Sequence, residues 1–440
     1  AELRDAFGPR RRLFPRNDHR VKTHLQYGTS GLELDLGGVN ATVLTPQFLD
    51  GLPDEGAAFE AAVRSPIGTG PLREKISATD RVAVVIPDGT RPLPSDRLLP
   101  WLFRELAHVP RENVTILVGA GTHRANTPAE LDAMLGPDIA RNYRVVNHQA
   151  ADAASLAPAG RSAMGYDVSF ARDYVTADRR ILLGFIEPHF VAGFSGGYKA
   201  AFPGVASLEA IMRYHAADVI GDPRSTWGEI EDNPTQAHVR AGGSLLPVDF
   251  CVNVTLNARK QITRYFCGDI MAAHREGCAF VKSTAMVACA HDFPVVVTTN
   301  SGFPLDQSLY QTVKGMAAAA RIVRPGGLIL AAARCNDGFP AHGNFRKIIE
   351  ASSSAQEMYD RIMAPGFSML DQWQAQYLAI VLLKARVGLY SELPEAQVRR
   401  AHLEPVTNLR AALDAELARI GRNAPVAILP EGPLTIPYLT

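Results

Sequence analysis

The sequence predicts an α/β protein of two domains, each built on a mainly parallel sheet with flanking helices. Short apolar runs of strand length alternate along the chain with segments of helical period, which is the pattern of βαβ units. The 440 residues exceed what one hydrophobic core usually holds. Loops rich in glycine and charged residues follow several apolar runs, at the place where open sheets bind ligands. We therefore expect an active site in the crevice between the domains.

We expect the N-terminal domain to span residues 1–290 and to bind a cofactor. Buried strands are predicted where apolar residues run together, and helices where they recur every three to four positions. The expected strands are 32–36, 81–86, 114–118, 144–146, 181–186 and 252–254. The expected helices are 59–63, 98–106, 128–135 with Thr127 as N-cap, 207–215, a segment after Asn233, and 272–288. The alternation favours a doubly wound sheet.

The C-terminal domain is expected over residues 291–411. Strand 295–299, helix 310–321 and strand 327–332 repeat the same alternation, so this domain is also predicted to be α/β. Residues 412–440 predict a helix and a proline-rich tail, which we expect to pack back on the N-terminal domain.

Composition narrows the class of protein. Lys and Arg number 45, as do Asp and Glu, and the resulting net charge of zero argues against a general nucleic-acid binder. No apolar run approaches the ~20 residues of a membrane span, so no membrane partner is expected. The five cysteines form no CxxC pair, which favours reduced thiols over a disulfide framework or zinc site. We expect a cytoplasmic protein.

Two loops carry polar side chains directly behind a strand. Asp88, Thr90 and Arg91 follow strand 81–86, and Arg91 could clamp a carboxylate or phosphate in bidentate fashion. A turn satisfied by the Asp88 side chain is the structural alternative. His123 follows two glycines after strand 114–118, where it is either a general acid/base near neutral pH or a packed loop residue.

The stretch from Gly184 to His215 organises the rest of the chain. His189 follows strand 181–186, and a turn containing Ser195, Gly196 and Gly197 then leads to Lys199. Glycines let backbone N–H groups approach an anion, and a lysine adds a point charge or a nucleophilic amine. A common strand-to-helix turn with a solvated lysine is the alternative. Loops that leave parallel strands share one sheet edge, so we expect the side chains of all three loops to converge.

Helix 310–321 offers a further polar face. Gln311 and Lys314 lie three residues apart near its start, where an anion is favoured, although a solvated lysine is the more ordinary arrangement. The histidines are widely separated, and no HExxH motif is present. A metal ion would therefore need additional ligands from a cofactor.

Four motifs together resemble the nickel-dependent lactate racemase family, whose members racemise or epimerise 2-hydroxy acids with a nickel pincer nucleotide. The motifs are Asp88-Gly-Thr-Arg-Pro92, Gly121-Thr-His-Arg124, Glu187-Pro-His-Phe-Val-Ala-Gly-Phe-Ser-Gly-Gly-Tyr-Lys199 with the downstream His215, and Tyr310-Gln-Thr-Val-Lys314. Their order and spacing agree with the family from residue 27 to about 420.

The resemblance implies a role for each of these residues. Lys199 is expected to hold the cofactor covalently and His215 to ligate nickel, a geometry that suits square-planar nickel(II). His123 and His189 are expected to act as acid/base groups, one on each side of the substrate. The resemblance implies that the substrate is bound by Arg91, Tyr310, Gln311 and Lys314. It implies that the cofactor and its supporting network are contacted by Asp88, Thr90, Ser195, Gly196 and Gly197.

The implied reaction transfers the α-hydrogen of a 2-hydroxy acid reversibly as a hydride to the nickel pincer nucleotide, while a histidine takes the hydroxyl proton. Cofactor-assembly enzymes are implied partners. Two alternatives remain: a nicotinamide-dependent 2-hydroxy acid dehydrogenase, for which no GxGxxG loop with a following acid is found, and a non-catalytic ligand-binding relative. Which 2-hydroxy acid is used does not follow from these motifs.

Overall fold

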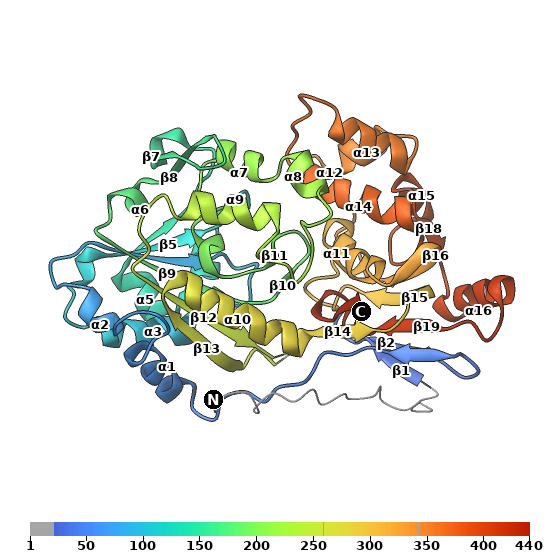
Figure 1. The fold of residues 1–440 in the computed structure, drawn as a ribbon, viewed down its shortest axis with the longest axis horizontal. Coiled ribbons are helices and arrows are strands. Elements are labelled where there is room, and N and C mark those ends of the chain that lie inside the picture. Colours follow the sequence, from blue (N-terminus) through green and yellow to red (C-terminus); the bar gives the residue numbers. More distant parts are fainter. Residues whose placement is uncertain (1–21, 258, 341–342) are drawn as a thin grey trace, which may run out of the picture.

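Two mainly parallel sheets with helices on both faces form the cores of the molecule, which confirms the predicted two-domain α/β fold. The structure is a computed structural model and describes residues 22–257, 259–340 and 343–440, so the first 21 residues of the expected N-terminal domain lie outside it. In Figure 1 the two sheets lie side by side, with the first half of the chain on the left and the second half mostly on the right.

The first sheet has six strands in the order β13-β12-β9-β4-β5-β6. Its strands are β4 (Val82–Pro87), β5 (Val114–Gly119), β6 (Arg144–Asn147), β9 (Arg179–Phe185), β12 (Phe250–Leu256) and β13 (Ile262–Gly268). The β4, β5, β6, β9 and β12 strands pair in parallel, and β13 adds antiparallel at the edge. The carboxyl ends of β4, β5 and β9 therefore meet at one edge, as the sequence predicted.

Residues of β4 alternate between two hydrophobic cores, because successive side chains in a strand point to opposite faces. Val84 joins the core under α1 and α3, and Val85 joins the core under α10 on the other face. Strands buried on both faces consist of near-continuous apolar residues, which is why this run was recognisable. The helices around this sheet are α1 (Glu55–Arg64), α2 (Leu72–Lys75), α3 (Ser95–Glu105), α4 (Pro128–Leu135), α5 (Pro137–Asn142), α6 (Arg172–Thr176), α7 (Leu208–Tyr214), α8 (Ala217–Gly221), α9 (Pro234–Gly243) and α10 (Ile270–Ala285).

The second sheet is parallel throughout and has six strands in the order β18-β17-β16-β15-β19-β3. Its strands are β3 (Ala41–Val43), β15 (Phe293–Thr299), β16 (Val323–Ala332), β17 (Arg386–Tyr390), β18 (Glu404–Val406) and β19 (Val426–Leu429). The helices around it are α11 (Leu309–Ala320), α12 (Phe345–Glu350), α13 (Ala355–Met363), α14 (Gln372–Lys384), α15 (Glu395–Arg400) and α16 (Leu409–Ile420). Val296 faces the core of α11 and α14, whereas Val297 faces α16 and the N-terminal hairpin.

Four short strand pairs among the described residues form separate two-stranded sheets beside the two large ones. These pairs are β1 (Lys22–Leu25) with β2 (Leu32–Asp35), β7 (Leu156–Arg161) with β8 (Asp167–Ala171), β10 (Pro188–His189) with β11 (Gly193–Phe194), and β14 (Met286–Cys289) with β20 (Ile436–Leu439). The described residues also form the 3₁₀ turns η1 (Arg111–Asn113), η2 (Ala153–Ser155), η3 (Gly197–Ala200) and η4 (Gly432–Leu434). The β10–β11 hairpin and η3 belong to the Gly184–His215 stretch, where the sequence indicated only a turn.

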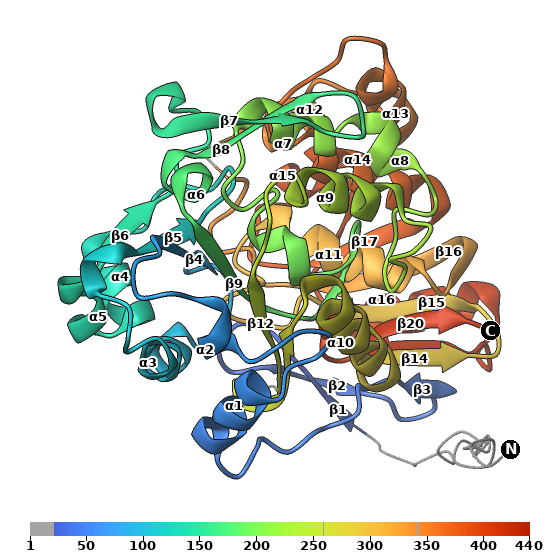
Figure 2. The same cartoon turned by 60° about the vertical axis from the view of Figure 1, so that its left-hand side comes forward.

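Both ends of the described chain belong to the second unit, which differs from the predicted domain bounds. Residues 412–440 were expected to pack on the first domain, but β19 is inserted between β15 and β3 of the second sheet, and β20 pairs with β14 next to the boundary. The N-terminal β3 also belongs to the second sheet, and β1 and β2 lie beside it in Figures 1 and 2. The apolar run of β19 is a strand buried on both faces, hidden in the sequence between proline-containing segments.

The chain consequently crosses between the two units twice. It leaves β3 of the second sheet for α1, and it returns after α10. The helix predicted over 272–288 ends at Ala285, and the next four residues extend into β14 because they pair with β20. The cap predicted for α4 is confirmed, since Thr127 and Glu130 form a reciprocal capping box.

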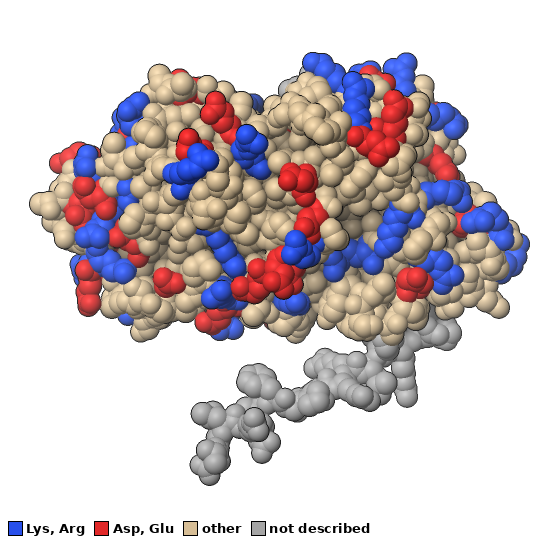
Figure 3. Space-filling view, turned by 45° about the horizontal axis from the view of Figure 1, so that its top comes forward, with Lys and Arg blue, Asp and Glu red and all other residues tan. Residues whose placement is uncertain are grey.

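Charges of both signs are interspersed on the face shown in Figure 3, in keeping with the zero net charge. Within the described ranges, no helix combines the length and apolar character that crossing a bilayer requires.

Candidate active site

One pocket collects side chains from both units. It is lined from the first sheet by the ends of β4, β5 and β9, by the β10–β11 hairpin and by α7, and from the second unit by α11 and the start of α14. The predicted residues on its wall are Asp88, Arg91, His123, His189, Ser195, Gly196, Lys199, His215, Tyr310, Gln311 and Lys314. Thr90 and Gly197 do not line the pocket: Thr90 bonds to Asp88, and Gly197 begins η3. The pocket thus lies between the two units, where the crevice was predicted.

A carboxylate and a histidine pair at the ends of β4 and β5. Asp88 is buried, and its Oδ2 lies 3.0 Å from Nδ1 of His123. Thr90 donates its hydroxyl hydrogen to Oδ1 of the same carboxylate at 2.9 Å. Burial alone would raise the pKa of Asp88, but the hydrogen bond and charge of His123, the charge of Arg91 and the Thr90 hydroxyl outweigh it and lower this pKa. The carboxylate is therefore ionised at neutral pH and orients the His123 ring.

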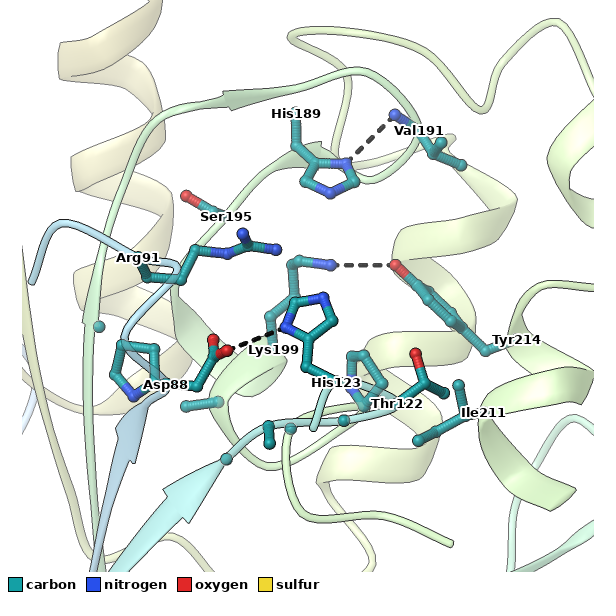
Figure 4. Close-up of a pocket in the computed structure, with 18 of the residues that line it drawn as sticks. Asp88, Arg91, Thr122, His123, His189, Val191, Ser195, Lys199, Ile211 and Tyr214 are labelled. Atoms are coloured by element: carbon teal, nitrogen blue, oxygen red, sulfur yellow. Dashed lines mark hydrogen bonds and ion pairs between the residues drawn. The ribbon is translucent and has the colours of Figure 1, made fainter. Parts of the chain in front are cut away.

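Arg91 reaches into the pocket from the same turn. Its backbone N–H donates to the carbonyl of Asp88, and its Nη1 donates to Oγ1 of Thr90 at 3.2 Å. In Figure 4 its guanidinium points toward the space between His123 and His189. The sequence left a self-satisfied turn at Asp88 as the alternative to a ligand-binding role for Arg91. The structure shows that turn, and the turn also directs Arg91 into the pocket.

The β10–β11 hairpin carries His189. Nδ1 of this ring accepts hydrogen bonds from the backbone N–H groups of Val191 at 3.2 Å and Ala192 at 3.1 Å. Burial, and then the positive charges of Lys199 and other cations in the pocket, hold the pKa of His189 well below its ordinary value. The ring is therefore neutral at physiological pH.

The glycine turn after the hairpin is shaped by close packing. Gly196 has φ +80°, and a Cβ there would lie 2.8 Å from Cγ1 of Ile186. Gly197 has φ +55°, and a Cβ there would lie 2.7 Å from the His274 ring. Both positions therefore require glycine. Ser195 donates its hydroxyl hydrogen to the carbonyl of Phe185 in β9 and accepts a hydrogen bond from the backbone N–H of Glu187, the residue before β10, so its side chain closes the turn from within.

Lys199 points from η3 into the pocket, and its Nζ donates a hydrogen bond of 3.0 Å to the hydroxyl of Tyr214. Burial, with smaller contributions from the charges of Arg91 and Lys314, lowers the pKa of Lys199 to about 7. About half of these amines are neutral at pH 7, and a neutral amine is a nucleophile. Figure 4 shows this amine between the rings of His123 and His189.

His215 caps the C-terminus of α7 and is packed on two sides. Trp373 of α14 stacks on its ring with centroids 4.1 Å apart, and Tyr214 packs edge-on at 4.2 Å. Nδ1 lies 3.0 Å from the carbonyl oxygen of Ile211, so the ring N–H donates there and Nε2 keeps its lone pair. Burial and the charge of Lys199 lower the pKa of His215 to about 3. A neutral imidazole oriented by a backbone carbonyl is a ready metal ligand.

The α11 side of the pocket carries Tyr310, Gln311 and Lys314. The Tyr310 hydroxyl accepts a hydrogen bond from Nε1 of Trp373 at 3.1 Å. Oε1 of Gln311 is buried and has no hydrogen-bond partner in the part of the chain that the structure describes. Burial and the charge of Arg91 lower the pKa of Lys314 to about 8, and the nearby carboxylate of Glu187 opposes this shift. The free amide oxygen and the lysine are thus available to a ligand.

The pocket holds more positive than negative groups. Besides burial, the charge of Arg91 lowers the pKa of both Lys199 and Lys314, and the charge of Lys314 also lowers that of Lys199. Burial raises the pKa of Glu187 against the pull of Arg91 and Lys314, so this carboxyl compensates only in part. An anionic ligand would relieve the repulsion.

A metal ion at His215 would need ligands from outside the protein. Among the described residues, no three metal-ligating side chains lie together. His215 offers one free nitrogen, and Lys199 offers a nucleophilic amine beside it. This donor set fits a metal whose remaining ligands belong to an organic cofactor held by Lys199.

The sequence indicated no role for four residues that matter here: Glu187, whose carboxylate raises the pKa of Lys314, and Tyr214, Trp373 and Gln374 on the pocket wall. The signal for the last two was the run Gln372-Trp-Gln-Ala-Gln376, since amide side chains are rarely buried in succession. Gln374 donates to the carbonyl of Tyr310, and Gln376 donates to the carbonyl of Ala217 in α8. These bonds join α14 both to α11 and to the first unit.

Two protein-family models match the chain, one in each half. The lactate racemase N-terminal domain matches residues 27–228, and the lactate racemase C-terminal domain matches residues 289–436. The second match includes β19, which agrees with its place in the second sheet.

Full-length relatives support the same assignment. The lactate racemase of Lactiplantibacillus plantarum is 34% identical over 381 residues, which cover 86% of this chain and 90% of the relative. That of Thermoanaerobacterium thermosaccharolyticum is 33% identical over 375 residues, covering 84% and 88%. The lactate racemase apoprotein structure from the latter organism superposes with a TM-score of 0.87 at 31% identity, covering 94% of this chain and 99% of that one. A Thermotoga maritima protein shares the fold, with a TM-score of 0.68 at 18% identity, covering 89% and 100%. The chain belongs to the lactate racemase family of isomerases.

Proposed function

We propose that this protein racemises or epimerises a 2-hydroxy acid. The observation that supports the proposal most directly is the convergence of His123 and His189 with Arg91, Lys199 and Lys314 in one pocket between the two units. Two proton-transfer groups beside a cluster of cations suit a substrate that carries both a carboxylate and an α-hydroxyl.

The substrate carboxylate would be held by Arg91 and Lys314. A guanidinium binds a carboxylate through two parallel hydrogen bonds, and a lysine adds a point charge. The free Oε1 of Gln311 can accept a hydrogen bond from the α-hydroxyl, and Tyr310 shapes the wall beside it. Substrate binding would also raise the pKa of Lys314, since its low value arises from burial and the charge of Arg91.

The cofactor proposed is the nickel pincer nucleotide, supplied by cofactor-assembly enzymes. Lys199 would carry it covalently, and Nε2 of His215 would ligate the nickel. Asp88, Thr90, Ser195, Gly196 and Gly197 would support its nucleotide side and the network around it. When bound, this group would supply the acceptor for the α-hydrogen, which leaves the substrate as a hydride.

His123 and His189 are proposed to act on the α-hydroxyl group, whose proton must leave as the carbonyl forms. Asp88 stabilises the positive charge that His123 acquires with that proton. The surrounding walls, which include Phe190 and Trp373, shield the exchanging proton from bulk water.

The test is to produce the chain together with the cofactor-assembly enzymes and to incubate it with single enantiomers of lactate, malate, longer 2-hydroxy acids and sugar acids. Chiral chromatography should show the opposite configuration at the α-carbon for at least one acid, and intact mass should show an adduct that Lys199→Ala lacks. Conversion of no acid by chain that carries the adduct would refute the proposal.

An α-deuterated substrate tests the hydride route separately. Deuterium retained in the product, with a primary isotope effect, is expected. Complete exchange with solvent would instead indicate proton abstraction. Net formation of the 2-keto acid with a nicotinamide cofactor would support the dehydrogenase alternative, and binding without turnover would support the non-catalytic one.

A further inference from the structure

His215 lies at the junction of two helices of the first unit. It forms the C-cap of α7, and Ala216 forms the N-cap of α8. The last carbonyl groups of a helix have no partner within that helix, so side chains, water or a ligand must bond to them. The carbonyl of His215 therefore needs a donor from elsewhere in the fold.

That donor is Gln372 of α14, which belongs to the second unit. Nε2 of its buried side chain donates to the carbonyl of His215 at 3.3 Å, and its Oε1 accepts the backbone N–H of Met369 at 2.8 Å. A backbone N–H can only donate, so the oxygen of this amide must face Met369 and its nitrogen must face His215. The orientation of the Gln372 amide is thus fixed by its own surroundings.

Gln376 repeats the contact one helical turn later. Its Nε2 donates to the carbonyl of Ala217 at 2.7 Å, and the side chain is buried. Residues four apart lie on the same face of a helix, so Gln372 and Gln376 point to the same junction. Gly221 at the end of α8 leaves room for this amide, because a Cβ there would lie 2.8 Å from Nε2 of Gln376. The two glutamines hold the chain on both sides of Ala216.

The ring and the backbone of His215 are held by different units. Nδ1 of the ring bonds to the carbonyl of Ile211 in α7, within the first unit. The backbone is bonded by α14, and Trp373, which lies between the two glutamines in the sequence, stacks on the ring. Figures 1 and 2 both show α14 lying against α8. The tautomer of His215 is thus set by the first unit, and its position depends on the second.

We propose that Gln372 and Gln376 are positioning residues for His215, so that the metal ligand supplied by one unit is held in place by the other. This inference rests on the proposed function, because it concerns the nitrogen that would ligate nickel. Neither glutamine lines the pocket, so both act through His215 and not on the substrate. A metal ligand must be held to within about 0.5 Å, and groups that orient such ligands typically contribute about 10–100-fold in metal affinity or activity.

A simpler alternative is that the two amides only dock the units against each other. Tyr377→Phe is the matched control, because the Tyr377 hydroxyl of the same helix donates to the carbonyls of Phe190 and Ser225 at 2.6 and 2.8 Å. It removes two bonds of the same interface but none to the α7–α8 junction. Gln372→Met and Gln376→Met remove the amides and keep a side chain of similar length. Where a methionine variant does not fold, glutamate at the same position is used, since its carboxylate offers no N–H group.

Nickel release is the first measurement. The chain is produced together with the cofactor-assembly enzymes, an excess of chelator is added, and the nickel that stays on the protein is followed by metal analysis. Gln372→Met and Gln376→Met should release nickel about 10-fold faster or more, and the visible absorption of the bound nickel should shift because the His215 nitrogen has moved. Tyr377→Phe should release it at the rate of the unsubstituted chain. Equal rates in all four proteins, or an equal acceleration in Tyr377→Phe, would overturn the proposal.

Labelling of the cofactor-free chain is the second measurement and does not depend on nickel. Diethyl pyrocarbonate modifies neutral imidazole rings, and peptide mass spectrometry locates the modified residue. His215 should react several-fold faster in the two glutamine variants, measured against the exposed His24 of the same sample, because its ring is no longer held under Trp373. An unchanged relative rate in folded variants would contradict the positioning role.

The two measurements also separate this proposal from the proposed function. If the unsubstituted chain racemises a 2-hydroxy acid but the glutamine variants neither release nickel nor react at His215 faster, the function stands and the positioning role fails. If His215 reacts faster in the variants but the unsubstituted chain takes up no nickel, the proposed function fails, and the metal role of the two glutamines fails with it.

Discussion

Removing the hydroxyl of Tyr214 should lower the pKa of Lys199 further. This hydroxyl accepts the one hydrogen bond that the structure shows for Nζ, at 3.0 Å, and the aromatic ring lies 5.3 Å from the same nitrogen. Tyr214→Phe keeps the ring, its packing on His215 and most of the buried volume. The change therefore isolates the hydrogen bond, which stabilises the charged form of the amine more than the neutral form.

The size of the shift follows from two magnitudes. A hydrogen bond to a charged group contributes about 1.5–3 kcal/mol, and one pKa unit corresponds to about 1.4 kcal/mol. The pKa of Lys199 is about 7 in the unsubstituted chain and should fall by roughly one to two further units in Tyr214→Phe. At pH 7 the neutral fraction should rise from about half to about nine-tenths or more.

Competitive acetylation of the cofactor-free chain, followed by peptide mass spectrometry between pH 5 and about 10, measures this shift. Exposed Lys22 serves as the internal reference. Tyr265→Phe is the matched control, because Tyr265 is buried beside α1 and bonds to the carbonyl of Glu55. The same labelling midpoint for Lys199 in Tyr214→Phe and in the unsubstituted chain would refute the reasoning, as would a midpoint above about 9 in both.

Three further predictions concern the same pocket. Lys199→Met should stabilise the cofactor-free protein at pH 7 by up to a few kcal/mol. The pKa of Lys199 is about 7 in the folded chain and 10.5 for an ordinary lysine, so the unfolded chain binds more protons between these values, and urea unfolding should show the advantage shrinking from pH 7 to 9. Asp88→Asn should lower kcat by about 10²-fold or more, because His123 loses its anionic partner, whereas the exposed Asp132→Asn should leave the rate unchanged; equal rates for both would exclude the Asp88–His123 pair from the reaction. Trp373→Leu should reduce nickel retained after dialysis several-fold, while Trp373→Phe, which keeps an aromatic ring on His215, should retain most of it; metal analysis showing no difference between the two would rule out the stack as a support for His215.

Residues placed by sheet topology could be predicted from the sequence. The apolar runs of β4, β5 and β9 identified parallel strands, and the carboxyl ends of such strands meet at one edge. Asp88, His123 and His189 therefore converge as expected. Their position follows from local pattern and one general rule about sheets.

Residues placed by the docking of the two units could not be predicted. Trp373 lies against His215 because α14 packs on α8, a contact between segments more than a hundred residues apart that no local periodicity encodes. The strand β19 was missed for a related reason. Its four apolar residues look like part of a tail until β3 and β15 are seen to flank it. Tyr214 was overlooked because its meaning depends on where Lys199 points.

The two crossings of the chain between the units lie next to each other. At the crossings the backbone N–H of Gln47 donates to the carbonyl of Thr284 at 2.9 Å, so the outgoing and returning segments are tied together at one place. Two adjacent connections of this kind would restrict sliding of the units more than rotation about that point. Elsewhere in the interface the hydroxyl of Tyr377 in α14 bonds to the carbonyls of Phe190 and Ser225 of the first unit. A rotation that opened the interface there would break those bonds and draw Trp373 away from His215, so the shape of the pocket wall is coupled to the angle between the two units.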